Sequence, residues 1–163
     1  MQPVVVLVVA LLVFRGLGAL GVRRFATWPA AGAHALAVML VITAAAHFVP
    51  ESVTVMPNHG DMVRMVPPFV PFPGAVVLLT GVLELLGAAG LVTTRFRRPA
   101  GVALAVLFLA MLPANIHAAL AEVPMAGQAA TPLWLRVPEQ IVFIVVALWP
   151  LRERSAVPVW AAR

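Results

Sequence analysis

Few side chains in this chain of 163 residues are able to take part in chemistry, and several of them sit in apolar surroundings. The chain contains no cysteine, which excludes thiolate catalysis, disulfide bonds and iron–sulfur ligation. Of the polar residues inside or at the end of long apolar segments, four are candidates for a role, because a polar group is energetically unfavourable there. They are Glu84, Asn115, Gln140 and His47.

Glu84 is the strongest of these candidates, because it lies about eleven residues into its apolar segment and hence near the middle of a membrane. A low-dielectric helix bundle favours the neutral acid, so Glu84 would carry a proton or bind a ligand. Asn115 and Gln140 would supply hydrogen bonds, and His47 a proton exit toward the outside. The alternative is that the buried polar groups only join helices, at roughly 0.6 kcal/mol per hydrogen bond.

The loop of residues 50–73 separates two of the apolar segments. It carries three further candidates, His59, Asp61 and Arg64. Its repeated prolines exclude a regular helix throughout, although residues 62–66 allow a short helical turn. Because valine, methionine and phenylalanine alternate with the prolines, we predict that the loop packs on the helices as a lid or plug.

The sequence predicts no metal site and no complete catalytic set. His59 and Asp61, even together with His47 and His117, match no recognised metal-ligand spacing. The serines and threonines have no neighbouring base that would activate them, and no glycine-rich phosphate loop is found. We therefore expect that the chain is not an enzyme by itself, and no cofactor is evident.

Composition indicates that these residues lie in lipid. The chain is 63% hydrophobic and 10% charged, whereas a soluble domain carries about 25% charged residues. Lipid is the solvent in which such a composition is stable. The basic residues are all arginines and the formal net charge is +5, but they lie beside apolar segments and form no separate basic domain. This distribution favours a membrane surface over nucleic acid as the partner.

Five apolar segments have the length of transmembrane helices, about 19 to 23 residues at 1.5 Å per residue. They run from about Pro3 to Val22, Pro29 to Val49, Gly74 to Val92, Pro99 to Ala121 and Leu133 to Leu151. The first segment lies where a signal peptide would lie, but no positive charge precedes it and no A-x-A cleavage site follows it. We therefore predict an all-α fold, a polytopic bundle of membrane helices that retains the first segment.

The placement of arginines predicts the orientation. Most of them fall in the first linker, the third linker and the tail, which share one side if all five segments cross the membrane: Arg23, Arg24, Arg95, Arg97, Arg98, Arg152, Arg154 and Arg163. Only Arg64 and Arg136 lie toward the other side. The positive-inside rule then places the N-terminus outside and the C-terminus in the cytoplasm. The arginine-only, alanine-rich composition favours a bacterial protein, and hence the bacterial inner membrane.

Several short motifs follow one another along the apolar segments. They are His47-Phe48, MVPPFVP at residues 65–71, the set Gly81, Glu84, Gly87, Ala88, Gly90 and Leu91, PANIH at 113–117, and LRVPEQ at 135–140. Their order and spacing resemble the DoxX family of small bacterial membrane proteins, from roughly Ala30 to Pro150. One departure is Glu139, where that pattern usually has an apolar residue.

The resemblance implies a domain organisation. Residues 29–152 would form a DoxX-like four-helix membrane domain that includes the proline-rich outer loop. Residues 1–28 would add one N-terminal transmembrane helix and a basic linker, and residues 153–163 a short cytoplasmic tail.

The resemblance implies a membrane function without fixing a reaction. Some members of that family are linked to a membrane subunit of a thiosulfate:quinone oxidoreductase, and others to redox maturation or complex assembly. We therefore expect an accessory subunit of a membrane redox or assembly complex, whose partners are the lipid bilayer and other subunits or further copies of the chain. Two alternatives remain open: a small transporter or binding protein for a lipophilic ligand, and a quinone-linked oxidoreductase, for which a quinone would be the cofactor.

Overall fold

The computed structural model describes residues 2–152, and helices are its only named elements. The prediction of an all-α chain is therefore confirmed for this part of the protein. The helices are α1 (Pro3–Ala19), η1 (Arg23–Phe25), α2 (Trp28–Ala44), η2 (Ala45–His47), α3 (His59–Met65), α4 (Pro73–Val92), α5 (Arg97–Leu120), α6 (Leu133–Leu148) and η3 (Trp149–Arg152). The predicted cytoplasmic tail, with Arg154 and Arg163, lies outside the described residues.

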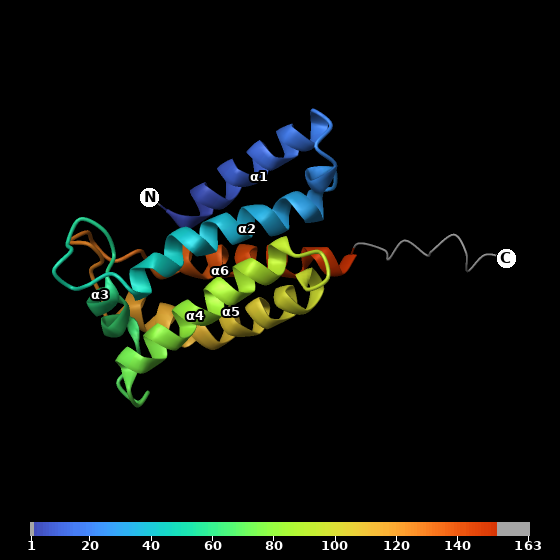
Figure 1. The fold of residues 1–163 in the computed structure, drawn as a ribbon. Helices are drawn as coiled ribbons and strands as arrows, with labels where there is room; N and C mark the ends of the chain where they lie inside the picture. Colours follow the sequence, from blue (N-terminus) through green and yellow to red (C-terminus); the bar gives the residue numbers. More distant parts are fainter. Residues whose placement is uncertain (1, 153–163) are drawn as a thin grey trace.

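Four long helices, α2, α4, α5 and α6, form a closed bundle (Figure 1). Around it, α2 packs against α4, α4 against α5, α5 against α6, and α6 against α2. The N-terminal helix α1 packs along the outer side of α2 (Figure 1). The turns between α1 and α2 and between α4 and α5 lie at one end, which we call the arginine end; the loops that contain α3 and residues 121–132 lie at the other, the loop end.

Four of the helical segments are long and apolar enough to cross a membrane: Trp28–His47, Pro73–Val92, Arg97–Leu120 and Leu133–Arg152. These segments have 20 to 24 residues, which at 1.5 Å per residue matches a hydrocarbon core of about 30 Å. Length and composition therefore suggest a membrane protein.

The first apolar helix, α1, is shorter than expected, because it ends at Ala19 and not at Val22. Gly21 adopts φ 99°, a left-handed conformation that glycine adopts without strain. The amide of Gly21 donates to the Gly18 carbonyl and that of Val22 to the Leu17 carbonyl, a Schellman motif that ends the helix. The remaining 17 residues of α1 span about 25 Å.

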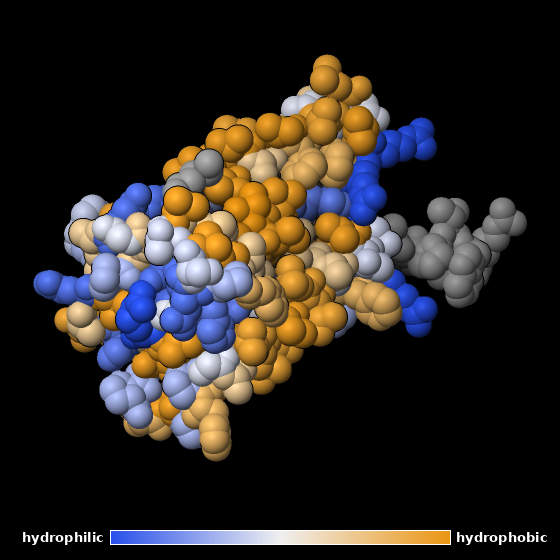
Figure 2. Space-filling model, turned by 60° about the vertical axis from the view of Figure 1, so that its left-hand side comes forward, coloured by the Kyte–Doolittle hydropathy of each residue, from blue (hydrophilic) through white to orange (hydrophobic). Residues whose placement is uncertain are grey.

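The surface of the bundle carries an apolar belt between two polar ends (Figure 2). Large apolar side chains point outward from the bundle helices, for example Leu79, Leu86, Val106 and Leu109. The bundle is therefore apolar outside as well as inside, which a water-exposed surface would not favour and lipid would.

Arg15 lies in the half of α1 nearer the arginine end. Its Nη1 donates to the carbonyl oxygens of Phe25 and Ala26, both at 3.0 Å, and its guanidinium lies 4.9 Å from the centre of the Trp28 ring. The side chain thus extends to the arginine end, so that its charge leaves the apolar belt.

Candidate functional site

Glu84 lies at the centre of the buried face of α4. The buried residues of this helix recur every three or four positions, which places them on one face: Val77, Gly81, Glu84, Ala88 and Leu91. Glu84 is therefore directed into the bundle and is only 4% exposed. A carboxyl in that position is removed from water and needs polar partners.

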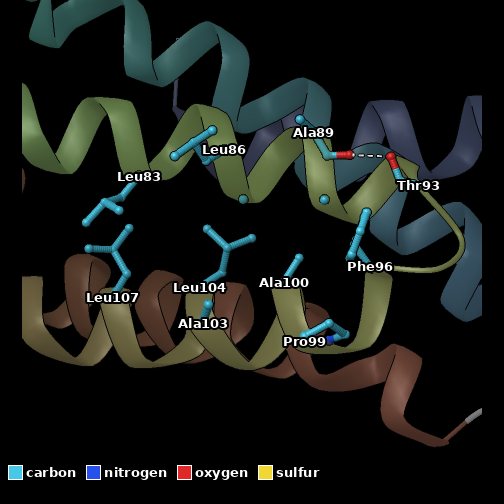
Figure 3. Close-up of a pocket in the computed structure, with 12 residues that line it drawn as sticks. Leu83, Leu86, Ala89, Thr93, Phe96, Pro99, Ala100, Ala103, Leu104 and Leu107 are labelled. Atoms are coloured by element: carbon cyan, nitrogen blue, oxygen red, sulfur yellow. Dashed lines mark hydrogen bonds between the residues drawn. The ribbon is translucent and has the colours of Figure 1, made fainter.

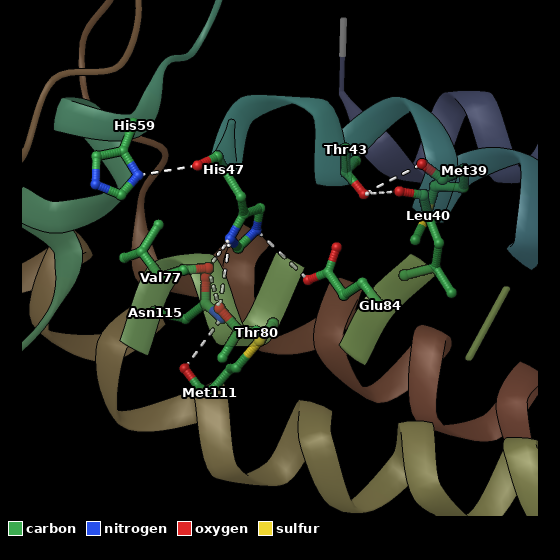
Figure 4. A network of polar contacts seen from close by, with 10 residues as sticks. All are labelled: Met39, Leu40, Thr43, His47, His59, Val77, Thr80, Glu84, Met111 and Asn115. Atoms are coloured by element: carbon green, nitrogen blue, oxygen red, sulfur yellow. Dashed lines mark hydrogen bonds and ion pairs between the residues drawn. The ribbon is translucent and has the colours of Figure 1, made fainter. Parts of the chain in front are cut away.

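His47 faces Glu84 from the end of α2, where the chain tightens into the 3-10 turn η2 (Figure 4). Its Nε2 lies 3.7 Å from Oε1 of Glu84. Its Nδ1 lies 2.7 Å from the carbonyl oxygen of Val77. Because a carbonyl only accepts hydrogen bonds, Nδ1 carries a hydrogen and donates it. That bond fixes the ring so that Nε2 is the atom presented to Glu84.

Gly81 allows His47 to lie this close to α4. A Cβ atom built at Gly81 would lie 2.6 Å from Cβ and 2.8 Å from Cγ of His47, and 3.0 Å from the Phe48 ring. These distances are shorter than van der Waals contact, so any larger residue would push His47 away. The glycine on one helix and the histidine on the other are therefore matched in shape.

The pair of Glu84 and His47 is suited to holding a proton. The 3.7 Å between Nε2 and Oε1 exceeds a hydrogen bond. On closer approach, a neutral His47 that donates from Nδ1 can accept at Nε2 from a protonated Glu84. When Glu84 is ionised, the same Nε2 can carry the proton and compensate the charge. The second carboxyl oxygen of Glu84, Oε2, is buried and has no hydrogen-bond partner within residues 2–152.

His59 of α3 covers this pair at the loop end (Figure 4). Its Nδ1 donates to the backbone oxygen of His47 at 2.9 Å, and its backbone amide donates to the Val49 oxygen at 2.9 Å. His59 is half-buried. Two imidazoles therefore lie between Glu84 and the loops, although their rings are not hydrogen-bonded to each other.

Asn115 belongs to a second polar group, which centres on Arg136. The buried guanidinium of Arg136 donates to Oδ1 of Asn115 at 3.2 Å, to the Thr131 carbonyl at 3.1 Å and to Sδ of Met125 at 3.5 Å. The Asn115 amide donates to the Met111 carbonyl at 3.3 Å. This group joins α5, α6 and the turn between them.

Gln140 lies on the same face of α6 as Arg136, one turn further into the bundle. Its Nε2 donates to the carbonyl oxygen of Phe108 at 2.7 Å. Pro113 has no amide hydrogen, so the carbonyl four residues before it lacks its helical donor. Phe108 is the residue just before that carbonyl. Gln140 therefore joins α6 to α5 where the backbone of α5 is interrupted.

Asp61 and Arg64 of the predicted lid loop are placed differently. Asp61 is 3% exposed, and its carboxylate accepts from the amides of Asn58 at 3.3 Å and Ala126 at 3.0 Å and pairs with Arg64. It thus fastens α3 to the turn at residues 121–132. Arg64 keeps more than half of its side chain exposed. The loop does pack on the bundle, since α3 contacts α4, α5 and η2.

Direct contacts therefore bring together only two of the four candidates from the apolar segments, His47 and Glu84. No hydrogen bond or ion pair among the described residues joins this pair to Asn115 or Gln140. We did not predict Arg136 as a member of these polar groups. Its spacing of four residues from Gln140, on one helix face, was the signal that could have indicated it.

The histidines and acids do not converge as a metal site would require. Within residues 2–152, no three such side chains come close enough together to hold an ion.

Fold and site together define a class of protein: an all-helical bundle with four helices apolar enough to cross a membrane and a buried acid–imidazole pair between two of them. The family described as a domain of unknown function, DUF8561, matches residues 36–151, and the chain belongs to that family. No curated protein and no solved structure matches the chain.

Proposed function

We propose that the chain is a multi-pass protein of the bacterial inner membrane, with its N-terminus outside and its C-terminus in the cytoplasm. The apolar belt of the bundle and the four long apolar helices support the membrane placement. The arginine end supports the orientation, because cytoplasmic loops carry an excess of basic residues. An alkaline phosphatase fused after Arg163 should then be inactive in cells, and an active fusion would overturn the orientation.

Within that membrane, we propose that Glu84 and His47 form a site that takes up and releases a proton. The observation that carries this proposal is the geometry of the pair: two buried ionisable groups 3.7 Å apart, of which one carboxyl oxygen has no hydrogen-bond partner in the described chain. A glutamate that only joined helices would be expected to have both oxygens bonded. A proton would reach water past the half-buried His59, which contacts His47 at the loop end.

We further propose that the chain serves as an accessory subunit of a membrane redox or assembly complex and does not carry out a reaction alone. The DoxX-like order of motifs supports this proposal. So does the character of the pair, in which an acid and an imidazole can pass a proton between them.

A second function, binding of a lipophilic ligand such as a quinone, is favoured by one specific observation. Oε2 of Glu84 is buried and unpartnered in the described chain, and a protonated carboxyl there would be a hydrogen-bond donor for a quinone carbonyl. Extraction of the purified protein with organic solvent would release a quinone in stoichiometric amount under this alternative, and an extract free of quinone would reject it.

Infrared spectroscopy tests the protonation of Glu84 directly. A protonated carboxyl has a carbonyl band that an ionised one lacks, and a pH titration of the protein in lipid should reveal one such band. The band should be lost in Glu84→Gln and retained in Glu122→Gln, which makes the same change at an exposed position. An identical titration of wild type and Glu84→Gln would contradict the proton site.

Co-purification tests the subunit proposal. The full chain with a C-terminal tag, extracted in a mild detergent, should retain other membrane polypeptides in a fixed ratio. Glu84→Gln should retain the same polypeptides, because the pair is buried and does not form the outer surface. Recovery of this chain alone, from cells that express it at its natural level, would reject the subunit proposal.

A further inference from the structure

The arginine end carries a basic cleft. The cleft lies between η1 and the end of α4 and is lined by Arg23, Arg24, Val92, Thr93 and Thr94. Both arginines are exposed to it. The carboxylates of residues 2–152 lie within the bundle or toward the loop end, and none is at this cleft: Glu51, Asp61, Glu84, Glu122 and Glu139.

Arg24 is held in a fixed position at this cleft. Its Nε donates to Nε2 of His34 at 2.8 Å, and its Nη2 donates to the carbonyl oxygen of Val92 at 3.0 Å. Nδ1 of the buried His34 donates in turn to the Ala30 oxygen at 2.7 Å, so Nε2 is free to accept. The guanidinium is therefore oriented by the bundle before any ligand arrives, which lowers the entropy lost on binding.

A further positive charge lies at the arginine end, where α5 begins. Arg97 is 7% exposed, and its Nε donates to the Leu91 carbonyl at 2.9 Å. Its Nη2 is buried without a hydrogen-bond partner in the part of the chain that the structure describes. The positive charges at this end favour an anion at the cleft.

An apolar groove of about 550 Å³ begins at the same place and runs along the outside of the bundle between α4 and α5 (Figure 3). Thr93 lines both the cleft and the groove. From Thr93 and Phe96 the groove extends toward Leu83 and Leu107, near the middle of the apolar belt. It exists because α4 and α5 meet through small residues: a Cβ at Gly90 would lie 2.5 Å from the Ala100 side chain.

We propose that this cleft and groove bind an anionic phospholipid of the cytoplasmic leaflet. Its phosphate would lie at Arg23, Arg24 and the hydroxyl of Thr94, and one acyl chain would lie in the groove toward Leu83. A basic cleft at the end of membrane helices, next to an apolar groove that shares Thr93 with it, has the two features that such a lipid requires. This inference rests on the membrane placement proposed above, but not on the role of Glu84.

The test uses the purified full chain in a neutral detergent and lipid binding measured by native mass spectrometry. Phosphatidylglycerol should bind more tightly than phosphatidylcholine with the same acyl chains. Each arginine at the surface of a membrane strengthens binding of anionic lipid about fivefold. Arg23→Gln should therefore weaken phosphatidylglycerol about fivefold, and Arg152→Gln, which removes a charge from the same end but outside the cleft, should change it less than twofold.

A second pair of variants tests the groove. Ala103→Trp fills the groove from α5, whereas Ala110→Trp places the same side chain on an exposed part of α5 outside it. The first should weaken phosphatidylglycerol at least fivefold and the second should not. Both alanines are exposed, so neither substitution overfills the core. Circular dichroism and a single gel-filtration peak confirm that each variant is folded.

The outcomes separate the possible errors. Equal affinity for the two lipids, or equal effects of Arg23→Gln and Arg152→Gln, would overturn the site. If glycerol 3-phosphate competed fully and Ala103→Trp had no effect, the cleft would bind a free phosphate and the lipid would be rejected. If the chain were found in the soluble fraction of cells, the membrane placement itself would fail, whatever the cleft bound.

Discussion

Gly81→Ala offers the most direct test of the geometry at the buried pair. The substitution adds one methyl group to α4, at a point where His47 and Phe48 of the neighbouring segment leave no room for it. The new Cβ would lie 2.6 Å from Cβ of His47, about 1 Å less than ordinary contact. Since neither atom is at the end of a flexible side chain, the relief must come from movement of α2 relative to α4.

The expected magnitude follows from the same geometry and from a matched control. Overpacking of this kind costs about 1–3 kcal/mol of folding free energy. Replacing glycine by alanine in a helix also stabilises it by about 0.8–1.0 kcal/mol. Gly16→Ala in α1 has only this second effect, because nothing lies within 4 Å of the added atom. Gly81→Ala should therefore be about 1–3 kcal/mol less stable than Gly16→Ala.

The assay is reversible unfolding of both variants in mixed micelles, followed by circular dichroism, with the infrared titration of Glu84 as a second measurement. The shift of α2 should move His47 away from Val77 and Glu84, so the carboxyl band should change in Gly81→Ala and not in Gly16→Ala. Equal stability of the two variants, together with an unchanged band, would refute the close packing of His47 on α4.

Three further predictions concern the other polar groups of the bundle. Asp61→Asn should destabilise the chain by about 1–3 kcal/mol and expose residues 121–132 to proteolysis. The reason is that the new side-chain amide offers a donor to backbone amides that need an acceptor. The control Glu122→Gln should leave proteolysis unchanged. Arg136→Lys should lower stability by about 1–3 kcal/mol in the same unfolding assay. One ammonium cannot replace the guanidinium at Asn115, Thr131 and Met125 together. A smaller loss of stability than for Arg95→Lys would contradict this prediction. Gln140→Leu should cost only about 0.6 kcal/mol, and a loss above about 2 kcal/mol would indicate a role beyond the single bond to Phe108.

Much of the fold could be predicted from hydropathy because each apolar segment must be long enough to cross the membrane. The predicted segment from Gly74 to Val92 differs from α4 by one residue at its start. Errors occurred where a local hydrogen-bond pattern overrides hydropathy. The Schellman motif at Gly21 shortens α1, and the capping box of Asn58 and Asp61 starts α3 at His59 and not at residue 62.

The face of α4 that carries Glu84 could also be read from the sequence, because Gly81, Glu84 and Ala88 share one helix face. The residue that pairs with Glu84 could not be predicted from the sequence. Depth in the membrane allows Asn115, Gln140 and His47 equally. The order of helices around the bundle separates Gln140 from Glu84, but α5, which carries Asn115, packs against α4 as α2 does. Since α2 is the neighbour of α4 and α6 packs against α5, His47 meets Glu84 while Gln140 meets the backbone of α5.

The two ends of the bundle differ in whether their charged side chains are compensated within the described chain, and this difference connects the proposals. At the loop end each buried charge is compensated inside the chain: Asp61 by Arg64 and backbone amides, and Arg136 by Asn115 and Thr131. At the arginine end, neither Arg24 nor Arg97 forms an ion pair with a carboxylate of residues 2–152. A membrane supplies anions to its surface but none to its interior. The arginine end can therefore obtain its counter-charge from lipid, whereas Glu84, in the interior, depends on His47 and on its own proton.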